Sequence, residues 1–313
     1  MTIDSFAASG NPEGPLQEIC RRFLAAFPDR IRGIHLLGSR ALGCAIPSSD
    51  VDLAIVFRGT AESGTRQAAQ DLAAEIRRSG PLVLELTVLD EAEARQGVRP
   101  NLKIGRLLAG EDALRDSPLK PKEELLGYFA YSPLYFSWVI RGRPPRLRHP
   151  LTYPNPAGEF FGYEQNGIWS GEKSFRPGLG LLINLAASIA NFRLALEAGE
   201  FVPNKSLTVA AYRKRFPADP LGEWLREVFE LCRQRWQGAI PTAPGDRPVL
   251  ADLCRRALAF ENDSMGRCLL ELPQLASVPS ADLKERIRGI LKVVQSDSAA
   301  HAAALASATR GVG

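Results

Sequence analysis

The sequence has few cysteines, and none of them forms a pair with the spacing of a metal site. The five are scattered along the 313 residues, with no Cys-x-x-Cys; they are Cys20, Cys44, Cys232, Cys254 and Cys268. Structural zinc sites and small disulfide frameworks need clustered cysteines, so the spacing argues against both. Scattered thiols are typical of a reducing compartment, and we therefore expect a cytoplasmic protein.

Long apolar runs are also missing, and we expect no signal peptide at the start of the sequence. No apolar run approaches the ~20 residues that a membrane helix needs, and the first residues lack a basic region followed by an apolar core. We therefore expect no membrane partner. The formal net charge of +4 is too small to indicate nucleic-acid binding by itself. A chain of 313 residues is long enough for two domains.

One stretch has the residue types of a metal and nucleotide site. An apolar run at residues 34–37 predicts a buried strand, and it ends at Gly38-Ser39, where a small residue lets the backbone approach a ligand. Asp50-Val-Asp52 then opens a second apolar run. Asp50 and Asp52 are two apart at a strand start, so both carboxylates point the same way, roughly 6–7 Å apart along the chain.

The two aspartates predict a divalent cation. Carboxylates this close repel each other, and a cation removes that repulsion. Mg²⁺ is commonly held by one or two carboxylates together with substrate phosphates. Gly38 and Ser39 would offer backbone N–H groups and a hydroxyl to a triphosphate beside the metal.

These residues resemble the nucleotidyltransferases of the DNA polymerase beta superfamily. That family carries a Gly-Ser turn and then Asp-x-Asp on the next strand, and small bacterial members share Gly-Ser-Arg-Ala-x-Gly…Ser-Asp-x-Asp-Leu. The matching residues are Gly38, Ser39, Arg40, Gly43, Ser49, Asp50, Asp52 and Leu53. The resemblance implies that Asp50 and Asp52 hold magnesium. It also implies that the nucleotide is bound by Gly38, Ser39, Arg40 and Ser49.

The resemblance further implies a third carboxylate on a later strand. Glu85 is the candidate, because an unpaired carboxylate is costly inside the apolar run at residues 81–90. The alternative is an edge-strand position that faces water, and Asp90 is the reserve. Glu85 would be a metal ligand or the general base for the attacking hydroxyl. Two Mg²⁺ ions about 3.5–4 Å apart would stabilise the attacking and leaving oxygens.

The sequence predicts an α+β fold with two domains. Residues 1–120 form a nucleotidyltransferase catalytic domain with a mixed sheet and flanking helices; residues 121–313 form a helical acceptor-binding domain with a frayed tail from residue 296. Helical spacing occurs at residues 15–27 and 63–78, and strands are expected at 31–37, 51–57, 81–90 and within 101–114. Helices of the second half are expected at 123–140, 179–198, 221–236, 249–270 and 281–294.

Two features of the second half bear on function. Residues 128–169 hold eleven aromatics around an arginine-rich loop; they line the acceptor site or an anionic partner's surface, or they are core aromatics beside a solvated loop. Residues 201–217 resemble the C-terminal domain of aminoglycoside adenylyltransferases, which implies that Lys205 reaches the nucleotide phosphates. The alternative is an exposed lysine near a helix start.

The function hypothesis is magnesium-dependent transfer of a nucleoside monophosphate, with AMP from ATP favoured by the resemblance. The acceptor is a hydroxyl of a small molecule such as an aminoglycoside. An aminoglycoside is a cation, so carboxylates would suit its pocket. The candidate carboxylates are Glu159, Glu164 and Glu172. A second hypothesis is transfer to a protein or to RNA. A third is a nucleotide-binding pseudoenzyme without turnover.

Overall fold

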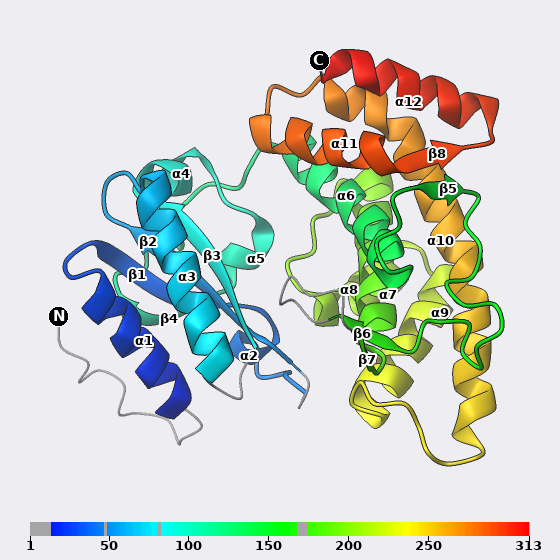
Figure 1. Ribbon diagram of the computed structural model, residues 1–313, viewed down its shortest axis with the longest axis horizontal. Coiled ribbons are helices and arrows are strands. Elements are labelled where there is room, and N and C mark those ends of the chain that lie inside the picture. Colours follow the sequence, from blue (N-terminus) through cyan, green and yellow to red (C-terminus); the bar gives the residue numbers. More distant parts are fainter. Residues whose placement is uncertain (1–13, 47–48, 80–82, 168–174, 313) are drawn as a thin grey trace. The chain divides into compact units, whose positions relative to one another are not determined.

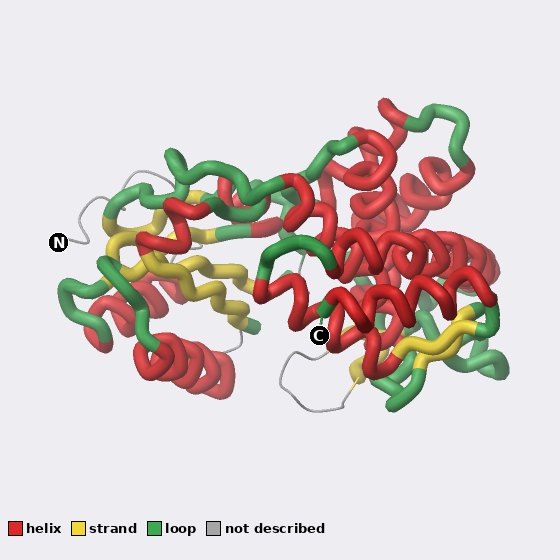
Figure 2. Tube along the Cα trace, turned by 90° about the horizontal axis from the view of Figure 1, so that it is seen from above, coloured by secondary structure: helices red, strands yellow, loops and turns green. Residues whose placement is uncertain are grey.

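The computed structural model describes residues 14–46, 49–79, 83–167 and 175–312. The chain divides into two compact units, Met1–Lys120 and Pro121–Gly313 (Figure 1). The first unit combines strands with helices and the second is mostly helical (Figure 2). The predicted α+β fold class is therefore confirmed.

A four-stranded mixed sheet forms the centre of the first unit. The strands β1 (Ile31–Leu36), β2 (Val51–Phe57), β3 (Leu84–Asp90) and β4 (Arg106–Gly110) lie in the order β3-β2-β1-β4. β1 pairs antiparallel with β2 and β4, whereas β2 and β3 are parallel. Helix α3 (Ser63–Ser79) makes the parallel pair possible, because it carries the chain back between the two strands.

Helices cover both faces of this sheet. α1 (Gly14–Ala26) and α3 pack on one face, where they meet Leu53, Ile55 and Phe57 of β2 (Figure 1). Alternate residues of a strand point to opposite faces, so Ala54 and Val56 enter a second core. That core also contains residues of α4 (Glu91–Gln96) and α5 (Pro100–Lys103). A short helix, α2 (Gly38–Ala41), follows β1.

The range 101–114 differs from its expected strand and turn. It begins inside α5, and the strand β4 occupies only the middle of the range. Pro100 is the first residue of α5, a position that tolerates proline because its N–H has no helical partner. Leu102 points inward and is 3% exposed. The apolar spacing of this range therefore belongs to a helix and a strand in succession.

The second unit is built around the apolar helix α7 (Gly180–Arg193). Its buried face contacts α6 (Lys122–Ile140) and α8 (Lys205–Arg215). The remaining helices are α9 (Pro220–Glu227), α10 (Asp246–Ala276), α11 (Ala281–Val293) and α12 (Ala299–Gly311), with π-helical turns η2 (Leu194–Ala198) and η3 (Val228–Arg235). Short strands pair as β5 (Leu147–His149) with β8 (Val294–Ser296) and β6 (Gln165–Gly167) with β7 (Phe175–Pro177).

One described stretch, Gly180–Ala198, is long and apolar enough to cross a membrane by length and composition alone. It consists of α7 and η2, and 67% of its most apolar window is buried inside the protein. Burial of that kind is what a core helix requires. The stretch coincides with the buried helix expected at residues 179–198.

The C-terminal residues contradict the prediction of a frayed tail. They form α12, which packs on α10. Ala308 is fully buried and Val312 is 4% exposed. Small side chains allow this close packing: a Cβ atom on Gly311 would lie 3.0 Å from the Cβ of Ala276. The Ala/Ser-rich composition of these residues therefore allows α12 to pack closely on α10, and it did not indicate disorder.

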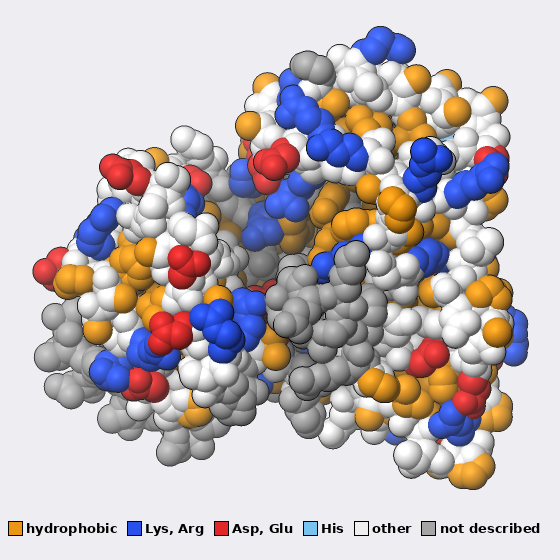
Figure 3. Space-filling model, viewed as in Figure 1, with side chains coloured by type: hydrophobic (Ala, Val, Ile, Leu, Met, Phe, Trp, Pro, Cys, Tyr) orange, Lys and Arg blue, Asp and Glu red, His pale blue; other side chains and the backbone are white. Residues whose placement is uncertain are grey.

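Acidic and basic side chains are interspersed over the first unit on the face that Figure 3 shows. Within this unit, Arg22 pairs with Glu75 and Arg58 with Glu111. This mixture is consistent with the small net charge of the chain. Exposed pairs of this kind contribute about 0–1 kcal/mol each to stability, so they matter more for solubility than for the fold.

Candidate metal and nucleotide site

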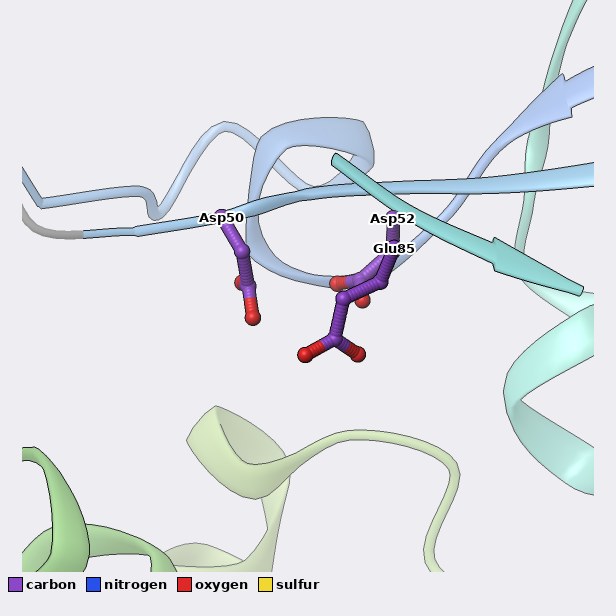
Figure 4. A group of neighbouring side chains, drawn as sticks. All are labelled: Asp50, Asp52 and Glu85. Carbon is purple, nitrogen blue, oxygen red and sulfur yellow. The ribbon is translucent and has the colours of Figure 1, made fainter. Parts of the chain in front are cut away.

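Three carboxylates in or directly before two adjacent strands come together at one end of the sheet. Asp50 immediately precedes β2, Asp52 is the second residue of β2, and Glu85 is the second residue of β3. Asp52 and Glu85 are register partners in the parallel pairing. One carboxylate oxygen of each residue lies within 4.8 Å of the others. Figure 4 shows all three side chains on the same side of the strands.

The alternation of β2 explains why these carboxylates lie together. Leu53 and Ile55 pack toward α1 and α3, so Asp52 points to the opposite face. β3 is indeed an edge strand, yet Glu85 is half-buried and lies beside Asp52. Two negative charges 4 Å apart repel by about 4 kcal/mol at an effective dielectric constant of about 20. A cation between them would remove that repulsion.

Gly38 brings the preceding turn directly against Asp52. Its φ of 65° lies in the left-handed region that favours glycine. A Cβ atom on Gly38 would lie 2.2 Å from Oδ2 of Asp52, which is too close for any other residue type without a shift. The N–H of Leu37 donates to the carbonyl of Asp52 at 2.8 Å, which fixes the spacing of turn and strand.

Ser39, Arg40 and Ser49, which were expected to contact the nucleotide, lie around this turn. The backbone N–H of Cys44 donates to the carbonyl of Ser39 at 2.9 Å. The guanidinium of Arg40 donates to the carbonyls of Ser49 and Asp50, at 2.9 and 3.0 Å. The hydroxyl of Ser49 accepts from the N–H of Ile46 at 2.9 Å. These backbone bonds were not predictable, because no residue pattern encodes a guanidinium's partners.

Asp90, the reserve carboxylate, has a structural role at the other end of β3. Its side chain accepts hydrogen bonds from the N–H groups of Glu93 and Ala61 and pairs with Arg66. Burial raises the pKa of Asp90, but the backbone hydrogen bonds and the charge of Arg66 outweigh it and lower the pKa overall. Asp90 caps α4 and lies outside the acidic cluster.

Lys205 is the first residue of α8 and belongs to the second unit, whereas the acidic cluster belongs to the first. Its Nζ donates to Oδ1 of Asn184 on α7 at 2.5 Å. The side chain of Asn204 caps the helix by accepting from the N–H of Ser206 at 2.7 Å. Lys205 is thus an exposed lysine at a helix start, held by an asparagine of the buried helix.

The carboxylates considered for a cationic acceptor have different environments. Glu159 forms an ion pair with Arg247, and this pair lowers the pKa of its carboxyl. In Glu164, Oε2 is buried and has no hydrogen-bond partner within the part of the chain that the structure describes. Glu172 and the aromatic Trp169 lie outside the described residues. Of the two carboxylates that the structure describes, only Glu164 thus has a buried oxygen without a hydrogen bond.

Most described aromatics of residues 128–169 belong to the core. Phe160 is 2% exposed and Tyr163 is fully buried. Tyr131 and Tyr135 stack with ring centroids 5.7 Å apart, and the guanidinium of Arg286 lies 5.3 Å from the Tyr131 ring centroid. These contacts favour the interpretation as core aromatics, because the chain's own side chains occupy the ring faces.

The acidic cluster fits a hard divalent cation such as Mg²⁺. All donors are carboxylate oxygens, the ligand type that Mg²⁺ prefers. One oxygen of each carboxylate lies within 4.8 Å of the other two, so rotation of the side chains could bring all three to a shared cation.

Comparison with known proteins gives a family for the first unit. A family model described as "Nucleotidyltransferase domain" matches residues 16–106. No curated protein matches the chain. Among solved structures, the chain is similar to a spectinomycin adenyltransferase from Enterococcus faecialis, crystallised with ATP and spectinomycin. The TM-score is 0.44 at 13% identity, over 80% of this chain and 100% of that chain. Residues 16–106, which contain Gly38, Ser39 and the three clustered carboxylates, form a nucleotidyltransferase domain.

Proposed function

We propose that the protein transfers a nucleoside monophosphate, AMP from ATP in the first instance, to a hydroxyl group of a small molecule. The observation that carries this proposal is the meeting of Asp50, Asp52 and Glu85 within 4.8 Å, inside a domain matched by the nucleotidyltransferase model. A pseudoenzyme has no need for three carboxylates that repel one another without a cation.

The three carboxylates would hold Mg²⁺. When bound, the metal would neutralise charge on the triphosphate and stabilise the attacking and leaving oxygens. The backbone of Gly38 and the hydroxyl of Ser39 would hold the outer phosphates. The closeness of Gly38 to Oδ2 of Asp52 supports this role, because it brings the turn beside the acidic cluster.

In the reaction, the acceptor oxygen forms a bond to the α-phosphorus of the triphosphate. The bond between that phosphorus and the oxygen bridging to the β-phosphate breaks, and pyrophosphate leaves with the bonding electrons. The acceptor hydroxyl loses its proton, for which Glu85 is the candidate base when it is not occupied as a metal ligand.

The second unit, residues 121–313, would choose the acceptor. Glu164 supports a cationic or hydroxyl-rich small molecule, because its buried Oε2 has no hydrogen-bond partner among the described residues. Lys205 would contribute a positive charge to the phosphates. Both assignments are proposals that accompany the transfer reaction.

The test is incubation of the protein with Mg²⁺, α-labelled ATP and one acceptor class at a time: an aminoglycoside panel, RNA, or protein lysate. We expect label on a small molecule, no transfer from γ-labelled ATP, and release of pyrophosphate. The Asp52→Asn variant should lose the activity. Asp71→Asn is the matched control, since Asp71 is exposed on α3 and accepts a hydrogen bond from the side chain of Gln67 on the same helix.

Label on RNA or protein would replace the small-molecule acceptor with a macromolecular one. Magnesium-dependent nucleotide binding without turnover on any acceptor would favour the pseudoenzyme. Full activity of Asp52→Asn would contradict the assignment of the acidic cluster.

A further inference from the structure

Asp50 and Asp52 are held in different ways. The carbonyl of Asp52 accepts from the N–H of Leu37, directly beyond the last register pair of β1 and β2. Asp50 precedes β2, and it is not a register partner of any residue in β1 or β3. Its carbonyl accepts instead from Nε of Arg40, at 3.0 Å. A side chain therefore does for Asp50 what the sheet does for Asp52.

Arg40 holds two consecutive carbonyls at once. Its Nη2 donates to Ser49 at 2.9 Å while its Nε donates to Asp50. The guanidinium is planar and rigid, so its two bonds fix the orientation of both peptide groups that flank the Cα of Asp50. The Cα of Asp50, and with it the direction of the carboxylate, follows from that orientation.

Ile46 and Ser49 are joined by two hydrogen bonds just before Asp50. The N–H of Ser49 donates to the carbonyl of Ile46 at 2.8 Å, and the N–H of Ile46 donates to the Ser49 hydroxyl at 2.9 Å. The Ser49 hydroxyl thus already accepts a hydrogen bond from the backbone. Arg40 and Ser49 both act on the backbone that leads into the acidic cluster.

We propose that Arg40 is a positioning residue for Asp50, which acts through the backbone and does not bind the nucleotide. This inference rests on the proposed function, because it assigns Asp50 to the metal. It revises the expectation that Arg40 and Ser49 contact the nucleotide. It also explains why an arginine directly after Gly-Ser accompanies Ser-Asp at the start of the next strand in this chain.

The test compares Arg40→Ala and Arg40→Lys by Mn²⁺ binding, followed by electron paramagnetic resonance without nucleotide, and by steady-state kinetics. We expect both variants to weaken Mn²⁺ binding about 10–100-fold, the effect typical of losing a group that orients a metal ligand. Lysine keeps the charge but not the two-pronged fork, so Arg40→Lys should resemble Arg40→Ala. At saturating metal, the KM for ATP should stay close to that of the parent protein.

The opposite pattern overturns the inference. If Arg40 contacts phosphate, Arg40→Ala raises the KM for ATP with unchanged Mn²⁺ affinity, and Arg40→Lys restores most of the affinity for ATP. Arg58→Ala is the matched control, since Arg58 pairs with the exposed Glu111 on the same unit, and it should leave Mn²⁺ binding unchanged.

Two further measurements separate the possible failures. Circular dichroism reports whether each variant is folded, and Arg40→Lys decides the question if Arg40→Ala does not fold. A parent protein that neither binds Mn²⁺ nor transfers nucleotide would contradict the proposed function itself. Parent binding that both Arg40 variants retain in full would contradict only the positioning role.

Discussion

Gly38 and Asp52 are so close that Oδ2 of Asp52 occupies the space where a side chain of residue 38 would begin, 2.2 Å from an ideal Cβ. Two requirements therefore select glycine at this position. The first is the positive φ of 65°, and the second is the space taken by the carboxylate. The two requirements are separable by experiment, because Gly43 shares only the first.

For Gly38→Ala we expect loss of both stability and metal binding. The left-handed backbone costs alanine roughly 1–2 kcal/mol, and the clash displaces Asp52 from the cluster. Gly43→Ala is the control, since Gly43 has a φ of 68° and nothing within 4 Å of its Cβ position. Both variants should lower the free energy of urea unfolding, Gly38→Ala by more because of the clash, but only Gly38→Ala should weaken Mn²⁺ binding. Equal Mn²⁺ affinity in the two variants would contradict this account.

For Glu85→Gln we expect slower nucleotide transfer in a folded protein. Glutamine keeps the size of the side chain but removes the charge that a metal ligand or a base needs. A base contributes typically 10²–10⁴-fold to a rate, so kcat should fall by roughly that factor. Unchanged Mn²⁺ affinity would assign Glu85 to the base, and weakened affinity to the metal. Glu62→Gln, at an exposed position just before α3, should have no effect on kcat.

For Lys205→Ala we expect a higher KM for ATP with little change in Mn²⁺ binding without nucleotide. A lysine that pairs with phosphate contributes a charge-assisted bond of about 1.5–3 kcal/mol, equal to roughly a 10–150-fold change in affinity. Asn184→Ala should give a smaller rise, because it removes the oxygen that holds the ammonium of Lys205. The control is Lys214→Ala, in the exposed last turn of the same helix. A KM that responds equally to Lys205→Ala and Lys214→Ala would remove Lys205 from the nucleotide site.

The stability of the first unit should fall with acid below about pH 6.5, the usual pKa of histidine. His35 is 1% exposed, and burial lowers its pKa although Asp112 opposes the shift. The unfolded chain therefore binds the proton more readily than the folded one, so stability is complete above pH 6.5 and decreases below it. Urea unfolding at pH 5.5 and 7.5 should show this loss, and His35→Gln should reduce it. An unchanged loss in the variant would assign the pH dependence to other groups.

The acidic cluster could be predicted from the sequence, but the hydrogen bonds that support it could not. Glu85 was predictable because a lone carboxylate in an apolar strand stands out, and the strand order then places it beside Asp52. The contacts of Arg40 were not predictable, because a flexible side chain with five hydrogen-bond donors can bind many partners. Asp90 shows the same limit: its position at a strand end suggested a ligand, whereas the structure makes it a helix cap.

The predictions for the C-terminal residues and for the residues of α5 were wrong for a different reason. Composition suggested disorder for the tail, yet the small side chains of α12 pack closely on α10. Apolar spacing over residues 101–114 fitted a strand, but the first part is a helix that begins at Pro100. In both places tertiary packing decided the outcome, and local pattern carries no direct information about it.

The most direct test of the central claim is the location of a metal ion in a crystal of the protein soaked with Mn²⁺ and a non-hydrolysable ATP analogue. Anomalous scattering identifies Mn²⁺ without reference to the expected ligands. The account predicts an anomalous peak in contact with carboxylate oxygens of Asp50, Asp52 and Glu85, with the phosphates beside Gly38. Mn²⁺ bound elsewhere, or bound nucleotide with no peak at this cluster, would contradict it.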